Sequence, residues 1–163
     1  MSPSEQLYDT LKSAGVDFVI SVPCKLLSEI IDLAAADKSI TYTPVTREEE
    51  GMGIMAGAYM AGKKPAILMQ NSGLGNSINA IHSLLNYCEI PVVFICSHRG
   101  SKGEPVEAQH RMGDAMRPLL EASGVSCFEI ESTDKLDQVK SGVEQAYANK
   151  KSASFLFPFS FWE

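Results

Sequence analysis

The chain has 163 residues, of which 45% are hydrophobic, and a formal net charge of −6 from 20 acidic and 14 basic residues. This length supports one sizeable hydrophobic core, so we expect a single domain over residues 1–163. The acidic balance argues against nucleic acid or an anionic membrane as a partner. The N-terminus resembles no signal peptide, and no apolar run approaches about 18 residues, so we expect a cytoplasmic protein.

Along the chain, short apolar runs alternate with longer segments whose apolar residues recur at helical spacing. This pattern predicts βαβ units and therefore an α/β fold with a mostly parallel sheet. Strands are expected over 17–22, 41–45, 65–71, 91–97, 126–130 and 154–159. Helices are expected over about 4–14, 25–36, 48–62, 75–87 and 135–149, with another that ends near 122 after an irregular stretch over 98–113.

Two of these strands, 65–71 and 91–97, are continuously apolar, which predicts a place at the centre of the sheet with both faces covered. In open parallel sheets, ligands bind beyond the carboxyl ends of the strands. The segments that follow the first four strands are therefore the candidates for a functional site: 23–25, 47–50, 71–76 and 97–111.

Three successive glutamates open the segment TREEEGMGIMAGAY (46–59), directly after a predicted strand. Acidic residues in a first helical turn commonly do no more than complement the helix dipole. The next strand ends in QNSGLGN (70–76), which predicts a glycine-containing turn that lets the backbone approach a ligand closely. Each feature is weak evidence by itself.

Taken together, the string over 46–81 resembles the pyrimidine-binding domain of thiamine diphosphate enzymes. The pattern of that family is a glutamate, small residues, a tyrosine ten positions on, then a strand and a glycine turn. Counting back ten positions from Tyr59 gives Glu49, with Glu50 as the alternative one position away. The similarity covers nearly the whole chain. It implies a three-layer α/β/α fold with a six-stranded sheet, and the activity of a 2-oxo acid decarboxylase.

The resemblance also implies a catalytic role for Glu49, whose carboxyl shares a proton with N1′ of the aminopyrimidine and thereby activates the cofactor. Such a carboxyl must carry a proton near neutral pH for part of the cycle. This requires burial in a dry interface, and electrostatic repulsion from the neighbouring carboxylate of Glu48 or Glu50 is a further contribution. The predicted cofactor-binding residues are Pro23, Glu49, Asn71, Gly73, Gly75 and Asn76.

Members of the family hold the diphosphate through Mg²⁺ with a GDG segment that an asparagine follows some two dozen residues later. The nearest match here, Gly113-Asp114-Ala115, lacks the second glycine, and we interpret it as a helix cap and turn. We therefore expect a partner β subunit to supply the diphosphate site and hold Mg²⁺, with no metal ligand in this chain. A noncatalytic regulatory or assembly subunit with the same fold is the alternative from a different class.

The substrate of such an enzyme would be a 2-oxo acid with a second anionic group, sulfonate or phosphonate, between which the sequence does not decide. Lys25 matches a substrate-contacting position of the family, although a lysine that opens a helix is as often solvated. Arg99 follows a central strand and is the second candidate for substrate binding. His110 lies in a stretch where related decarboxylases carry an active-site histidine, so we assign it a catalytic role in proton transfer.

Overall fold

The computed structural model describes residues 1–163 and contains one six-stranded sheet in the order β2-β1-β3-β4-β6-β5, in which every pair of neighbours is parallel. The strands are β1 (Phe18–Ser21), β2 (Thr41–Pro44), β3 (Pro65–Gln70), β4 (Val93–Ser97), β5 (Ser126–Glu129) and β6 (Ala153–Phe157). As expected, β3 and β4 lie at the centre, and every residue of β4 is buried.

The helices are α1 (Pro3–Ser13), α2 (Ser28–Ala36), α3 (Glu48–Met60), α4 (Asn71–Asn76), α5 (Ile78–Ala80), α6 (His110–Ala122) and α7 (Leu136–Asn149). A π-helix over Ile81–Asn86 follows α5, and a 3₁₀ turn over Lys25–Leu27 precedes α2. None of the helices combines the length and apolarity that a membrane span needs.

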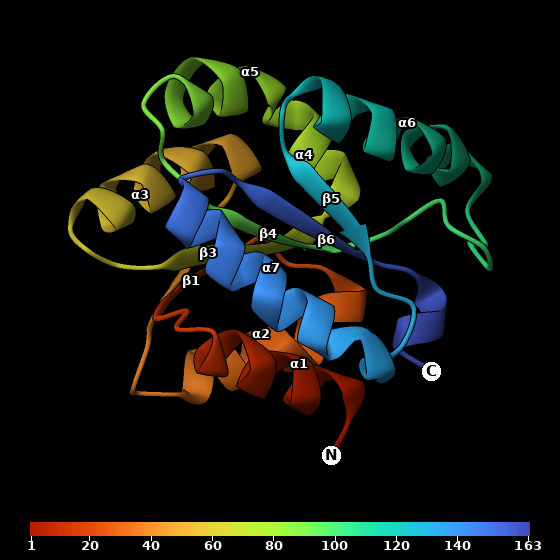
Figure 1. Ribbon diagram of the computed structural model, residues 1–163. Coiled ribbons are helices and arrows are strands. Elements are labelled where there is room, and N and C mark those ends of the chain that lie inside the picture. Colours follow the sequence, from red (N-terminus) through yellow and green to blue (C-terminus); the bar gives the residue numbers. More distant parts are fainter.

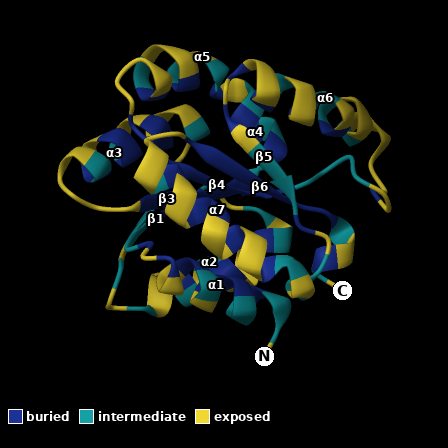
Figure 2. Cartoon of the chain, in the orientation of Figure 1, coloured by how far each residue is buried: buried dark blue, intermediate teal, exposed yellow.

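The sheet separates two hydrophobic clusters, because successive side chains of a strand point to opposite faces. In β3, Ala66 and Leu68 belong to the cluster under α1, α2 and α7, whereas Ile67 and Met69 belong to the cluster under α3, α4 and α6. Figure 1 shows these helices as two layers, one on each side of the sheet, and Figure 2 shows the buried strands between them. The predicted α/β class with a parallel six-stranded sheet is confirmed.

The start of α1 shows how local sequence fixes an element. The Ser2 hydroxyl accepts a hydrogen bond from the Glu5 N–H at 3.1 Å, and the Glu5 carboxylate accepts one from the Ser2 N–H at 2.7 Å. This capping box satisfies two N–H groups that a helix start leaves free. The chain leaves the helix at Gly15, whose φ of +90° favours glycine.

Four local predictions were wrong. The QNSGLGN segment is not an open turn, because α4 begins at Asn71 directly after β3, and the single helix expected over 75–87 is divided into three pieces. The predicted irregular stretch is also shorter than expected, because α6 begins at His110. Gly113-Asp114-Ala115 therefore lies inside that helix and is neither a cap nor a turn.

Candidate active site

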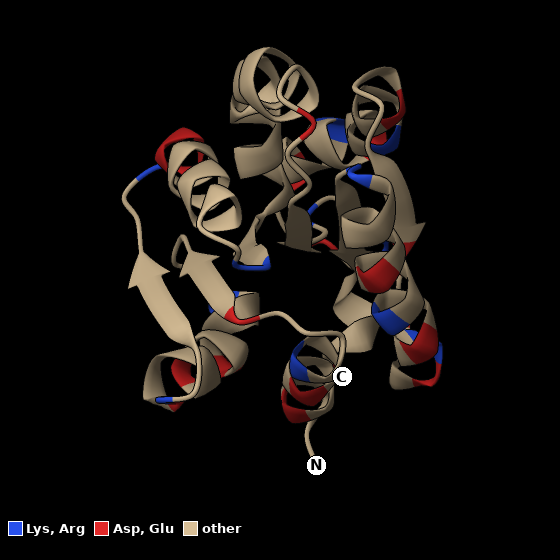
Figure 3. Cartoon of the chain, turned by 60° about the vertical axis from the view of Figure 1, so that its left-hand side comes forward, with Lys and Arg blue, Asp and Glu red and all other residues tan.

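The carboxyl ends of four neighbouring strands bring the candidate segments to one edge of the sheet. The strands β2, β1, β3 and β4 lie side by side and parallel, so the residues that follow Pro44, Ser21, Gln70 and Ser97 emerge at the same edge. The acidic first turn of α3 stands at this edge, coloured red at the upper left of Figure 3. Parallel topology thus gathers segments that are distant in sequence.

The three glutamates of this turn have different surroundings. Glu50 accepts hydrogen bonds from the backbone N–H and the hydroxyl of Thr46, at 3.3 and 3.0 Å, and so stabilises the start of α3. Glu48 is half-buried and lies against Gly73, where an added Cβ would stand only 2.2 Å from its Oε1 atom. Glu49 points outward with 43% of its side chain exposed and pairs with Arg47 Nη2 at 2.6 Å.

Glu49 is therefore not buried by its own chain. An exposed ion pair of this kind contributes little to stability and leaves the carboxylate free to change partners. Burial of Glu49, which its predicted catalytic role requires, can come only from a second molecule that covers this edge of the sheet. Its role in activating a cofactor stays a prediction.

The predicted cofactor-binding residues of α4 differ in accessibility. Asn71 is fully buried, and its amide is shared with the backbone of Arg99: the side-chain N–H donates to the Arg99 carbonyl at 2.9 Å, and the Arg99 N–H donates to the side-chain oxygen at 3.1 Å. Gly73 is covered by Glu48, Gly75 lies beside Met112, and Asn76 is exposed. Asn71 therefore positions the loop after β4 in this structure, and only Asn76 offers a free side chain.

Arg99 is likewise engaged within the chain. Its Nε and Nη2 atoms donate to the two carboxylate oxygens of Glu104 at 2.6 and 2.7 Å, while the backbone N–H groups of Gly100 and Val106 donate to the same carboxylate. The Glu104 side chain is completely buried, and the hydrogen bond from Arg99 lowers its pKa to about 2. Direct binding of a substrate by Arg99 would have to compete with this bidentate pair.

The predicted histidine lies on the surface. His110 is the first residue of α6 and is exposed, at the same end of the sheet as the other candidates. The neighbouring His98 is more enclosed: its Nε2 is 3.3 Å from the Gly113 carbonyl oxygen, and its Nδ1 is 3.6 Å from Glu129 Oε1. His98 thus helps to join the end of β4 to α6 and β5, whereas His110 is free to meet a ligand.

A cavity of about 380 Å³ lies between the end of β1, the first turns of α2 and the edge strand β2, and Pro23 and Lys25 line it. Lys25 is exposed and forms no ion pair in this structure. The same cavity contains Ser21, Cys24 and Tyr42, none of which the sequence assigned a role. Their joint position depends on strand register, which the sequence pattern does not reveal.

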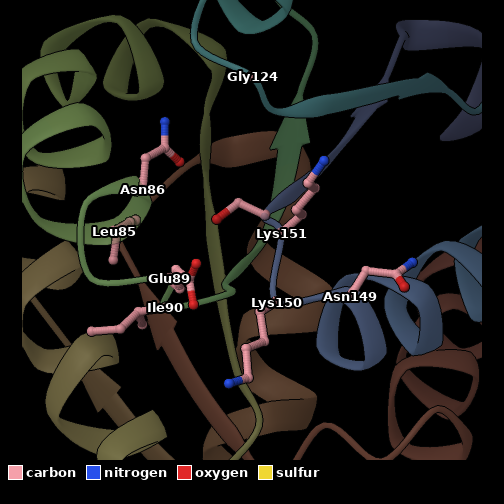
Figure 4. Close-up of a pocket in the computed structure, with 9 residues that line it drawn as sticks. Leu85, Asn86, Glu89, Ile90, Gly124, Asn149, Lys150 and Lys151 are labelled. Atoms are coloured by element: carbon pink, nitrogen blue, oxygen red, sulfur yellow. The ribbon is translucent and has the colours of Figure 1, made fainter.

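A second cavity of about 380 Å³ lies at the opposite edge, where β4, β5 and β6 begin (Figure 4). It contains none of the predicted site residues. Its two lysines, Lys150 and Lys151, are exposed, and their ammonium groups point apart in Figure 4. No group of three or more His, Cys, Asp or Glu side chains anywhere in the structure is placed to hold a metal ion.

The fold and the acidic helix start at a parallel sheet edge agree with the sequence resemblance. Residues 1–118 match the family model described as thiamine pyrophosphate enzyme, N-terminal TPP binding domain. A solved structure, 2-oxoglutarate:ferredoxin oxidoreductase from Magnetococcus marinus, has a TM-score of 0.77 over 99% of this chain and 29% of its own, at 16% identity. That likeness establishes the fold, and the family match defines the chain as a domain of the thiamine pyrophosphate enzymes.

Curated relatives narrow this class further. Sulfopyruvate decarboxylase subunit alpha from Methanococcus maripaludis is 43% identical over 100% of this chain and 98% of its own length. Phosphonopyruvate decarboxylase from Streptomyces viridochromogenes is 35% identical over 91% of this chain and 38% of its own length. The chain belongs to the family of sulfopyruvate decarboxylase α subunits.

Proposed function

We propose that this chain is the α subunit of a thiamine diphosphate-dependent decarboxylase that converts 3-sulfopyruvate to sulfoacetaldehyde and CO₂. The observation that carries this proposal is the 43% identity to a sulfopyruvate decarboxylase α subunit over the whole chain. In the reaction, the bond between the carboxylate carbon and the keto carbon breaks and CO₂ leaves. A proton then takes the place of CO₂ at the former keto carbon.

The residues at the sheet edge fit the pyrimidine half of the cofactor. Glu49 offers a carboxylate that is held only by an exposed ion pair, so it is free to bind a ring nitrogen. Glu48 lies where any side chain at residue 73 would stand, which explains why only glycine fits there. Bound thiamine diphosphate supplies a carbon nucleophile and then an acceptor for the electrons of the broken bond.

The chain's own residues have separate tasks in this proposal. Glu49 holds and transfers the proton at the pyrimidine nitrogen, and it can do so near neutral pH once a partner excludes water from it. Pro23, Gly75 and Asn76, which are at least partly exposed, would contact the cofactor. His110, exposed at the start of α6, is placed to exchange protons with the substrate, and Lys25 attracts its anionic groups.

A partner β subunit would supply the rest of the site, including the diphosphate-binding segment and Mg²⁺. The relative from Methanococcus maripaludis is named as a subunit alpha, which implies a second kind of subunit in that enzyme. The exposure of Glu49 supports the same arrangement, because a covering molecule would bury it. We propose that residues 1–163 form a single pyrimidine-binding domain and that the complex works in the cytoplasm.

Phosphonopyruvate is the second candidate substrate, since a phosphonopyruvate decarboxylase is 35% identical over 91% of this chain. The two substrates share the 2-oxo acid and differ in the terminal tetrahedral anion. Sulfopyruvate is favoured because the relative with that name matches over nearly its full length, whereas this chain covers only 38% of the phosphonopyruvate enzyme.

Two neighbouring glutamates allow a matched test of the cofactor role. Glu49→Gln in the complex with the partner is expected to abolish CO₂ release from 3-sulfopyruvate and to preserve the circular dichroism spectrum. Glu50→Gln is the control and is expected to keep measurable turnover, with a loss of stability only, through its bonds to Thr46. Full activity in Glu49→Gln would contradict the assignment.

A further inference from the structure

The buried hydroxyl of Ser21 restricts the direction of one hydrogen bond in the cavity between β1, α2 and β2. Ser21 is 1% exposed, and its Oγ lies 2.7 Å from the Tyr42 hydroxyl oxygen. No other acceptor for the Ser21 proton is present. A buried donor without an acceptor costs about 1–3 kcal/mol, so Ser21 donates to Tyr42.

This direction leaves the proton of the Tyr42 hydroxyl without an acceptor in the chain. Tyr42 is half-buried and lines the cavity, so a molecule bound there could accept this proton. The Ser28 hydroxyl, which also lines the cavity, is already committed to the Lys25 carbonyl oxygen at 3.0 Å. Among the serine, tyrosine and lysine side chains of the cavity, the Tyr42 hydroxyl and the Lys25 ammonium group remain as donors.

A neutral donor beside a cation is suited to an anionic group that accepts several hydrogen bonds. The cavity volume of about 380 Å³ lies at the lower end of the range typical of small-ligand sites. Asp32 is its only acidic residue and is exposed. The donors of the cavity thus suit a small anion.

We propose that this cavity receives the second anionic group of the substrate. The Tyr42 hydroxyl donates a hydrogen bond to that group and determines specificity for it. Ser21 is a positioning residue that orients Tyr42. The proposal rests on the proposed function, because it assigns a place to the sulfonate of 3-sulfopyruvate. Tyr42 lies in the edge strand β2, two residues before its end, and pairs in register with Val19 of β1. Its ring is therefore held by the sheet rather than by a loop.

The test compares kinetics and direct binding in the complex with the partner. Tyr42→Phe is expected to raise KM for 3-sulfopyruvate about tenfold or more, the effect of losing a hydrogen bond to a charged group. The increase in KM should exceed any fall in kcat. The dissociation constant of sulfoacetate, a dianion without a keto group, should rise by the same factor. Ser21→Ala, which keeps the donor but frees its orientation, should raise both constants by a smaller factor.

Tyr87→Phe is the matched control, because Tyr87 is 84% exposed and lies outside the cavity. Its KM and sulfoacetate affinity should equal those of the wild type. If the wild type decarboxylates 3-sulfopyruvate but Tyr42→Phe leaves KM and sulfoacetate affinity unchanged, the inference is overturned and the proposed function stands. If the wild type does not decarboxylate 3-sulfopyruvate, the proposed function fails. Sulfoacetate binding that weakens in Tyr42→Phe would then still support the anion site, and absence of binding would overturn it.

Discussion

Replacing Glu104 by glutamine is expected to destabilise the loop that follows β4. The carboxylate accepts four hydrogen bonds, two from the Arg99 guanidinium and one each from the N–H groups of Gly100 and Val106. Glutamine has a single acceptor oxygen, so its NH₂ group would face two of these donors. Loss of one partner of a buried ion pair typically costs about 3–5 kcal/mol. Because 20% of the Arg99 side chain remains exposed to water, we expect about 2–4 kcal/mol.

The same contact predicts an acid dependence. The hydrogen bond from Arg99 lowers the pKa of Glu104 from 4.5 to about 2 in the folded protein. This difference corresponds to stabilisation on the order of 3 kcal/mol, present in full above the unfolded pKa and lost as the pH falls from about 5 through about 2. Glu104→Gln should lack this contribution at every pH.

Urea denaturation of the wild type and Glu104→Gln between pH 7 and pH 3 measures both effects. The difference in the free energy of unfolding should be largest at pH 7 and should shrink below about pH 5, where Glu104 becomes protonated in the unfolded chain. Glu107→Gln is the control, since Glu107 is an exposed glutamate of the same loop. A Glu104→Gln variant within about 0.5 kcal/mol of the wild type at pH 7 would refute the reasoning, because surface substitutions already reach that value.

Three further predictions concern glycines, thiols and metal. Gly113→Ala should destabilise the chain by more than about 2 kcal/mol, because the added Cβ would lie 2.7 Å from the backbone of Gly100. Gly57→Ala should instead stabilise α3 by about 0.5–1 kcal/mol, because nothing lies within 4 Å of the added Cβ. Thermal melts of the two variants measure both effects. Burial raises the pKa of the Cys96 thiol, so a thiol reagent should label exposed Cys88 rapidly and Cys96 only in denaturant; equal rates would contradict this. EDTA should leave the melting temperature of the isolated chain unchanged, because no group of three potential ligands is present; a fall would reveal a metal site.

The central elements were predictable because their signals are local. The runs 65–71 and 91–97 are apolar up to Met69 and Cys96, and they contain the two central strands β3 and β4. The segment after β3 was not predictable in the same way, because apolar spacing does not distinguish α-helix from the π-helix over Ile81–Asn86. The helical conformation of the segment continues past Gly73, where the Ser77 hydroxyl donates a hydrogen bond to the Gly73 carbonyl oxygen at 2.9 Å. The apolar periodicity does not reveal this bond.

The candidate site was predictable in its location but not in its contacts. The motif count led to Glu49 at the sheet edge, and parallel strands placed the other segments beside it. The pairing of Arg99 with Glu104 and of Asn71 with the Arg99 backbone depends on how the loop folds back, which spacing does not specify. The Ser21–Tyr42 bond likewise joins two strands whose register became known only from the structure.

The most direct test of the central claim is CO₂ release from 3-sulfopyruvate and 3-phosphonopyruvate by this chain together with the partner that copurifies with it from its native cells. The assay is run with and without thiamine diphosphate and Mg²⁺. We predict release from 3-sulfopyruvate that depends on thiamine diphosphate. Release from 3-phosphonopyruvate alone would contradict the proposed substrate, and release from neither, with partner and cofactor present, would contradict the proposed reaction.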